Sequence, residues 1–306
     1  MSDTLADPWG LQALQQRLQT VEPDLRLEMV ASIASTNSAL LERATALRAR
    51  GHSSAAPPFP ACILVAQAQT QGRGRQGRTW HAQPGASLTF SLALTLAPRN
   101  WSGLSLAVGV ALAEALDPAP AATAPLQAPR IGLKWPNDLW LRDANAPGGG
   151  RKLGGVLIES CGWAMAEAAA AAPAAEAARP VPRVCVIGVG LNVGPQGVEG
   201  ASSGVAWLQE LRPQATAPRA LASLALPLLQ AVRRFEQTGF AEVAGAFARR
   251  DLLQGHAVST TLAGLCVGIA QGVDAAGALQ VRASDGTLRA VVGGEVTVRP
   301  LVGSTP

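Results

Sequence analysis

The chain has 306 residues and a mass of 31.3 kDa, with 48% hydrophobic residues, 15% charged residues and a formal net charge of +4. This length and balance predict a globular protein of one large or two ordinary domains, and they exclude a disordered, collagen-like or coiled-coil chain. No run of about 18 uninterrupted apolar residues occurs, which argues against a membrane-spanning helix.

The amino-terminal residues and the cysteines indicate the cellular compartment. The segment MSDTLADPWG has acidic residues where a secretory signal would carry positive charge, so we expect a cytoplasmic protein that does not contact a membrane. The cysteines show no CxxC spacing, and neither disulfides nor a zinc site are expected. They are Cys62, Cys161, Cys185 and Cys266.

Hydrophobic periodicity predicts alternating helices and strands in the first part of the chain. Ser35, Thr36 and Asn37 offer an N-cap to a helix that ends near Gly51. The other expected elements are a helix at Leu11–Thr20, a strand at Leu25–Ala31, strands at Cys62–Ala68 and Ser87–Leu96, and a helix at Gly103–Leu116.

The second part predicts more strands, a helical region and a separate β-unit. Strand arms flank a Pro-Asn turn, two longer strands follow, and helical periodicity runs from Pro218 to about Leu253. Short strands with Gly turns then predict a small β-barrel. The strands are expected at Ile131–Trp135, Asp138–Leu141, Lys152–Ser160, Val184–Val193 and within Ala257–Pro300, with surface loops at Asp143–Gly150 and Ala164–Pro182.

A glycine- and arginine-rich loop, Gly72–Arg78, directly follows a predicted buried strand. It formally matches G-x-G-x-x-G, but no helix is predicted after it and no acidic residue occurs before Glu114, so a dinucleotide site is excluded. From Arg43 to Ala113 there are seven arginines and no Asp or Glu. The loop is therefore expected to close on an anionic ligand, and the alternative is an ordinary solvated basic turn.

Two further segments carry rare residues. Lys134 and Lys152 are the only lysines, and Asp138 beside Asn137 on a turn suits a magnesium and phosphate site, although plain turn chemistry is an alternative. Glycines in the buried strand before Asn192 indicate close approach of a ligand or another backbone, and the Asn192 amide matches an adenine edge. A strand with a bulge is the alternative there.

Five motifs occur in the order found in the biotin protein ligase family, which the sequence resembles from about residue 30 to Pro300. These are Ser35-Thr36-Asn37, Gln69–Arg78, Lys134–Asp138, Arg151–Gly155 and Gly188–Asn192, and the end of the chain, Gly293–Arg299, also matches. The resemblance implies an α+β fold with a mixed β-sheet flanked by helices, like the class II aminoacyl-tRNA synthetase core. It places this catalytic domain at residues 1–254 and a small SH3-like β-barrel at residues 255–306.

The resemblance also implies roles for individual residues. Arg75 and Lys152 would be catalytic, and Asp138 would be the magnesium ligand. The biotin-binding residues would be Ser35, Thr36, Asn37, Gln69, Arg73, Gly74, Arg75 and Lys152, and the ATP-binding residues would be Arg75, Arg78, Trp80, Asn137, Asp138, Lys152, Asn192 and Arg299.

The implied reaction joins biotin to a protein in two steps. Biotin and MgATP give biotinyl-5'-AMP and pyrophosphate, and biotin then passes to the acceptor lysine of a biotin carrier domain of acetyl-CoA carboxylase or another biotin-dependent carboxylase. ATP and Mg²⁺ would be needed, without a tightly bound prosthetic group. About 30 residues precede Ser35, too few for a winged-helix module, so no specific DNA binding is expected. A homodimer is compatible with the family.

Two alternatives remain at this point. A lipoate or octanoate ligase of the related family would activate another carboxylic acid on a similar core. A non-enzymatic biotin or nucleotide sensor would bind the ligands without turnover.

Overall fold

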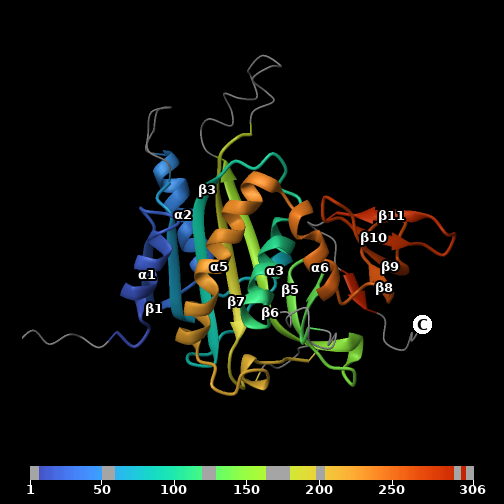
Figure 1. Cartoon of the computed structure of the whole chain (residues 1–306), viewed down its shortest axis with the longest axis horizontal. Helices are drawn as coiled ribbons and strands as arrows, with labels where there is room; N and C mark the ends of the chain where they lie inside the picture. Colours follow the sequence, from blue (N-terminus) through green and yellow to red (C-terminus); the bar gives the residue numbers. More distant parts are fainter. Residues whose placement is uncertain are drawn as a thin grey trace, which may run out of the picture.

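The computed structural model describes residues 7–49, 59–118, 129–162, 180–197, 204–292 and 298–300. Most of the Ala164–Pro182 loop and of the terminal Gly293–Arg299 motif lie outside these residues. The described strands form two sheets, one of seven strands and one of five. Figure 1 shows the larger sheet at the centre of the molecule and the smaller one to the side of it.

The seven-stranded sheet is mixed, with the order β1-β2-β3-β7-β6-β5-β4. β1 and β2 are parallel, and the other neighbours are antiparallel. The strands are β1 (Arg26–Ile33), β2 (Cys62–Gln69), β3 (Ser87–Leu96), β4 (Ile131–Lys134), β5 (Asp138–Arg142), β6 (Gly150–Gly162) and β7 (Arg183–Asn192). These positions confirm the strands expected from the sequence.

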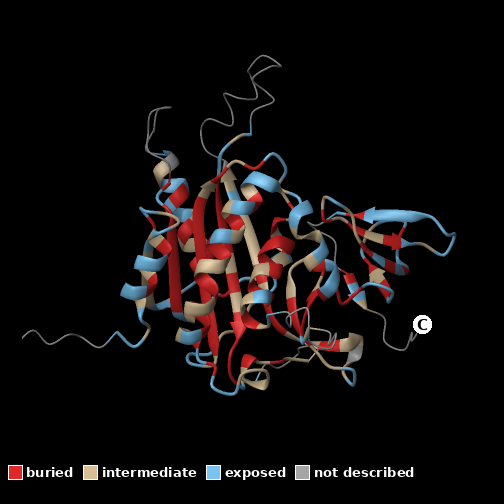
Figure 2. Ribbon diagram, in the orientation of Figure 1, coloured by how far each residue is buried: buried red, intermediate tan, exposed pale blue. Residues whose placement is uncertain are grey.

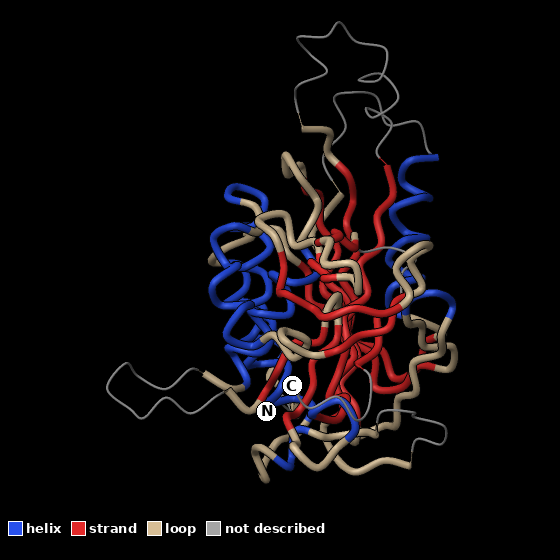
Figure 3. Tube along the Cα trace, turned by 90° about the vertical axis from the view of Figure 1, so that its right-hand side faces the viewer, coloured by secondary structure: helices blue, strands red, loops and turns tan. Residues whose placement is uncertain are grey.

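Helices cover both faces of this sheet (Figure 3). α2 packs against β2, β3, β6 and β7 on one face, while α1, α3 and α5 belong to the larger apolar core on the other. The helices are α1 (Leu11–Gln19), α2 (Thr36–Ala49), α3 (Leu104–Leu116), α5 (Ala217–Thr238) and α6 (Ala244–Arg250), with short 3-10 turns at η1 (Arg75–Gly77), η2 (Pro147–Gly149), η3 (Leu208–Glu210) and η4 (Ala241–Val243).

Burial explains why these segments adopt these elements. β3 and most of β7 lie between two helical layers. Nearly all of their residues are therefore buried, and most are apolar (Figure 2). α3 packs against the sheet, α5 and α6, and most of its residues are buried and apolar. α2 instead has a single buried stripe that includes Leu40 and Ala44, and its Ser35 cap accepts a hydrogen bond from the Ser38 backbone at 3.4 Å.

The five-stranded sheet is antiparallel and has the order β11-β10-β9-β8-β12. It is linked to the β4–β5 turn by the buried indole Nε1 of Trp135, which donates to the Gly277 carbonyl at 3.0 Å. The strands are β8 (Ala257–Thr260), β9 (Val267–Val273), β10 (Leu279–Arg282), β11 (Leu288–Val291) and β12 (Val298–Pro300). The expected carboxy-terminal β-unit is thus confirmed as a sheet, while its closure into an SH3-like barrel and its boundary at residue 254 stay predictions.

Two of the four cysteines serve as core residues. Cys62 and Cys185 are buried, and burial raises the pKa of each thiol to about 12, which keeps it neutral at physiological pH. Within the described part of the chain, each helix is too short or too polar to cross a membrane.

Arg250 connects the last helix to the large sheet, and its replacement is expected to destabilise the protein. The guanidinium is 2% exposed and donates to the Asp117 carboxylate at 3.2 Å, to the Ile131 carbonyl at 3.0 Å and to the Asp117 carbonyl. Arg250→Met should lower the free energy of unfolding by about 3 kcal/mol, because it removes the cation that neutralises the Asp117 carboxylate and the donors to both carbonyls. Denaturant unfolding checks this, with exposed Arg249→Met as the matched control. Equal stability of both variants would contradict the prediction.

Candidate active site

A cavity of about 940 Å³, its open mouth included, lies on the α2 side of the large sheet. The amino terminus of α2 forms one wall, the β4–β5 turn and the Gly72–Arg78 loop form the others, and β6 and β7 form the floor. Most of the site residues expected from the sequence line this one cavity. They are Ser35, Thr36, Asn37, Gln69, Arg73, Gly74, Arg75, Arg78, Trp80, Asn137, Asp138 and Lys152.

At one end of the cavity, a chain of hydrogen bonds fixes the polar side chains before α2. Gln69 Oε1 accepts from the backbone N–H of Thr36 at 2.8 Å, and Thr36 Oγ1 lies 2.7 Å from Ser91 Oγ. Ser91 Oγ donates to Asn37 Oδ1 at 2.6 Å. Ser91 is fully buried in β3 and was not predicted as a site residue. A hydroxyl inside an apolar strand signals such a partner, because buried polar groups need hydrogen bonds.

Glycines on β7 make room for two of these side chains. A Cβ at Gly188 would lie 2.3 Å from Asn37 Oδ1, and one at Gly190 would lie 2.4 Å from Trp80 Cε2. Both distances are too short for real contacts. The glycines therefore let the Asn37 and Trp80 side chains lie flat on the sheet, whereas the sequence predicted the approach of a ligand or another backbone.

At the other end, cations surround a single carboxylate. Lys152 Nζ lies 2.9 Å from Asp138 Oδ1 and 5.7 Å from the centre of the Trp80 ring. Arg75 donates to Asn137 Oδ1 at 3.2 Å, and burial lowers the pKa of Arg75 although Asp138 opposes this. This excess of positive charge in a partly desolvated space favours an anionic ligand.

Lys134 extends this positive cluster toward the smaller sheet. Its Nζ donates to the Val298 carbonyl at 2.9 Å and lies over the Trp140 ring at 5.6 Å. Burial lowers the pKa of Lys134, as do the nearby cations Lys152, Arg78 and Arg299, while Asp138 opposes them. The cavity therefore ends against β12 of the carboxy-terminal sheet.

The Gly72–Arg78 loop forms a tight clamp and is not followed by a helix, as expected. Gly74 N donates to the Arg78 carbonyl at 2.7 Å, and Trp80 N donates to the Gly72 carbonyl at 2.9 Å. A Cβ at Gly72 would lie 2.4 Å from the Trp80 carbonyl oxygen, so the clamp requires glycine there. The clamp places the Trp80 indole in the cavity wall, where its buried Nε1 has no hydrogen-bond partner among the described residues.

Asn192 and Arg299 do not line the cavity. The Asn192 amide is buried and donates to the Lys152 carbonyl at 3.2 Å and to the Ala206 carbonyl at 3.1 Å, while its oxygen accepts from Gln196 at 2.5 Å. In this structure Asn192 thus supports the backbone of Lys152, and its contact with adenine stays a prediction. Arg299 is exposed and follows Val298, which does line the cavity.

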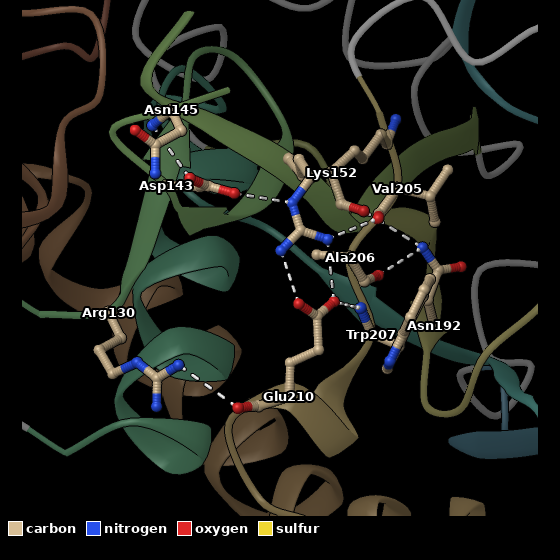
Figure 4. A network of polar contacts seen from close by, with 10 residues as sticks. Arg130, Asp143, Asn145, Lys152, Asn192, Val205, Ala206, Trp207 and Glu210 are labelled. Carbon is tan, nitrogen blue, oxygen red and sulfur yellow. Dashed lines mark hydrogen bonds and ion pairs between the residues drawn. The ribbon is translucent and has the colours of Figure 1, made fainter. Parts of the chain in front are cut away.

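A second polar network supports Lys152 at the start of β6, where residues 204–206 pair with the strand (Figure 4). Arg151 donates to both carboxylate oxygens of Glu210, at 3.1 and 2.6 Å, and to Asp143 at 3.1 Å. Glu210 also accepts from the Trp207 backbone at 3.0 Å. Hydrogen bonds from Lys152 N to the Gly204 carbonyl and from Ala206 N to the Lys152 carbonyl complete the link. The network fixes the residue 204–210 segment to the start of β6, beside Lys152.

Glu210→Gln is expected to remove an acid-sensitive part of the stability. Burial alone would raise the pKa of Glu210, but hydrogen bonds from Arg151 and from the Trp207 backbone lower it below its ordinary value of 4.5. The ion pair therefore contributes fully above pH 4.5 and is lost as the pH falls through the lower folded-state pKa. At neutral pH we expect the free energy of unfolding of the variant to be about 1 kcal/mol lower than that of wild type. This difference should become smaller as the pH falls.

Thermal unfolding of both proteins on either side of pH 4.5 checks this prediction. Glu242→Gln is the control, because its pair with Arg234 is longer, at 3.4 Å, and mostly exposed. A stability gap that stays constant across this pH range would contradict the role of Glu210.

Comparisons with known proteins match two family models to the chain. The model described as "Biotin/lipoate A/B protein ligase family" matches residues 44–171, and "Biotin protein ligase C terminal domain" matches residues 260–299. The chain is 32% identical to a bifunctional ligase/repressor of Escherichia coli over 272 residues, which cover 87% of this chain and 72% of the relative. It is 31% identical to a biotin acetyl-CoA-carboxylase ligase of Mycobacterium tuberculosis over 283 residues, 90% and 91% of the two chains.

Solved structures show the same fold. A biotin protein ligase from Aquifex aeolicus in complex with biotin and ATP superposes with a TM-score of 0.63 at 23% identity, covering 90% of this chain and 99% of that chain. A second structure of the Aquifex aeolicus protein gives a TM-score of 0.60 at 21% identity, with the same coverage. The α+β fold with a large mixed sheet and a carboxy-terminal antiparallel sheet is thus that of these ligases.

Proposed function

The chain belongs to the biotin protein ligase family, and from this premise we propose how its cavity residues divide the work of joining biotin to a protein. In the first half-reaction, a carboxylate oxygen of biotin attacks the α-phosphorus of ATP. The bond from that phosphorus to the leaving oxygen breaks, so that biotinyl-5'-AMP and pyrophosphate form. Two anions must meet in line, and the site therefore has to position them and neutralise their charge.

The observation that carries the proposal is the single cavity with a neutral polar end and a cationic end. Hydrogen-bonding groups of Thr36, Asn37 and Gln69 suit the uncharged ureido ring of biotin. Lys152 and Arg75 suit the biotin carboxylate and the α-phosphate, because both carry fixed positive charge in a partly buried space. Ser35 caps the helix that presents the neutral end, and Arg73 and Gly74 belong to the loop over it.

The nucleotide is proposed to bind along Trp80 and the β4–β5 turn. The Trp80 ring lies beside Lys152 in the cavity wall, and Arg78 adds positive charge to the same cavity. Asn192 and Arg299 would join this set only after a rearrangement, since neither lines the cavity. The proposal for these two residues is therefore tested by nucleotide affinity of their variants.

Mg²⁺ is proposed to bind at Asp138. One carboxylate beside an amide suits a magnesium ion that takes most of its ligands from phosphates and water. When bound, the ion would neutralise charge on the ATP phosphates.

In the second half-reaction, the amine of an acceptor lysine attacks the acyl carbon of biotinyl-5'-AMP and AMP leaves. The proposed acceptor is the biotin carrier domain of acetyl-CoA carboxylase or of another biotin-dependent carboxylase. The Gly72–Arg78 loop is proposed to shield the mixed anhydride from water until the carrier arrives. A homodimer and the absence of specific DNA binding also stay predictions.

Pyrophosphate release from MgATP tests the proposed function. The purified protein is assayed with biotin, lipoate, octanoate or no acid, and hydroxylamine traps any acyl-adenylate. Release that requires biotin establishes the first half-reaction, and transfer to an isolated carrier domain then tests the second. Release with lipoate or octanoate instead would assign the chain to the related ligases, and no release with any acid would favour a sensor.

A further inference from the structure

Glu159 on β6 joins two parts of the site that lie far apart in the sequence. Its Oε1 accepts from Arg73 Nη2 at 2.9 Å, and its Oε2 accepts from Asn37 Nδ2 at 3.0 Å. Arg73 also donates to Ser38 Oγ at 3.2 Å. One carboxylate therefore connects the glycine-rich loop with the amino terminus of α2.

The contact with Asn37 fixes the orientation of its amide. Asn37 Nδ2 donates to Glu159 and, at 3.3 Å, to the Leu157 carbonyl, while Oδ1 accepts from Ser91. A carboxylate can only accept hydrogen bonds, so it selects the rotamer that presents NH₂ to Glu159 and oxygen to Ser91. From Ser91 the hydrogen bonds continue to Thr36 and Gln69.

Glu159 itself does not line the cavity, although Leu157 on the same strand does. It therefore acts through other residues. The Arg73 pair is partly exposed, with 48% of the Arg73 side chain and 23% of the Glu159 side chain accessible to solvent. An ion pair of this exposure contributes enough free energy to favour the closed conformation of the loop, and little enough that the loop can still open.

We propose that Glu159 is a positioning residue that latches the closed Gly72–Arg78 loop to the biotin-binding end of the site. Loop closure and the orientation of Asn37 then stabilise each other, so bound biotin holds the loop closed and the closed loop retains biotin. This inference rests on the proposed function, because it assigns biotin to the end of the cavity formed by Thr36, Asn37 and Gln69.

The substitution Glu159→Gln tests the latch with little change in shape. A glutamine amide has one acceptor oxygen and one donor nitrogen, whereas the site presents donors on both sides. Whichever way the amide turns, its NH₂ group faces either Arg73 or Asn37 donor to donor. The variant therefore keeps the side-chain length and loses one of the two contacts.

The experiment measures the dissociation rate of radiolabelled biotin from wild type, Glu159→Gln, Arg73→Gln and the double variant. We expect each single variant to release biotin about fivefold faster, which is what one partly exposed ion pair contributes. The double variant should be no faster than the faster single variant, because both substitutions open the same latch. In steady state, KM for biotin should rise more than kcat falls.

Glu28→Gln is the matched control. It removes the Glu28–Arg43 ion pair, which has a length of 2.8 Å and similar exposure and joins β1 to α2 outside the cavity. A merely structural role for Glu159 predicts that both variants lower the melting temperature alike and leave the biotin dissociation rate unchanged. The latch predicts a changed rate in Glu159→Gln alone.

The outcomes separate the latch from the proposed function. Wild-type protein that neither binds nor activates biotin would overturn both. Wild-type protein that activates biotin, together with a Glu159→Gln variant that releases biotin at the wild-type rate, would overturn the latch alone. The latch would also be overturned if the double variant released biotin faster by the product of the two single fold-changes. Arg73 and Glu159 would then act independently.

Discussion

Lys152→Met is expected to lower kcat/KM for biotin-dependent pyrophosphate release at least about a hundredfold, because one donor aimed at developing charge is worth that much. Lys152 lies between Asp138 and the Trp80 ring, with its backbone held by Asn192 and the 204–206 segment. Methionine keeps most of the side-chain volume and removes the charge at the reacting phosphate. The melting temperature should change little, since the Lys152 side chain is one-third exposed.

Two further variants make this test specific to Lys152. Lys152→Arg keeps the positive charge but alters its geometry, so it should retain part of the activity. Arg43→Met removes an exposed cation outside the cavity and should leave activity unchanged. Hydroxylamine trapping reports adenylate formation in each case. Near-normal trapping by Lys152→Met would show that Lys152 does not stabilise the reacting groups.

Gly188→Ala and Gly190→Ala are expected to damage different halves of the site, although only one residue separates them on β7. The new methyl at position 188 would displace Asn37, which Ser91 and Glu159 hold in place. Affinity for biotin should then fall by up to about a hundredfold, since displacements near 1 Å have such effects. The methyl at position 190 would displace Trp80, so affinity for ATP should fall comparably while biotin binding changes less.

Equilibrium binding of biotin and of ATP to each variant measures this separation. Gly245→Ala is the control, because its Cβ would meet only the Arg249 side chain, at an ordinary contact distance of 3.9 Å. If both β7 variants lost both ligands equally, general disruption of the sheet would explain the result, and the assignment of the two ends of the cavity would be wrong.

The sequence alone determined the elements and most of the cavity wall. The limits expected for β3 agree with the structure, and the remaining strands agree to within a few residues, because local periodicity reports which segments are buried between two layers. The loop at Gly72–Arg78 was correctly separated from a dinucleotide motif, because the helix and acidic residue that such a motif requires are missing after it. Its place on the cavity wall supports the ligand-closing interpretation over the solvated turn.

The tertiary structure decided which residues meet. Glu159 accepts hydrogen bonds from Arg73, 86 residues away in the sequence, and from Asn37, 122 residues away. A local sequence pattern reveals neither contact. Asn192 was predicted to face a nucleotide, yet its amide holds the backbone of Lys152, 40 positions away. These contacts arise because β7 inserts between β3 and β6 in the sheet. Sheet order is set by long-range pairing of strands, whereas hydrophobic periodicity reports only which face of each strand is buried.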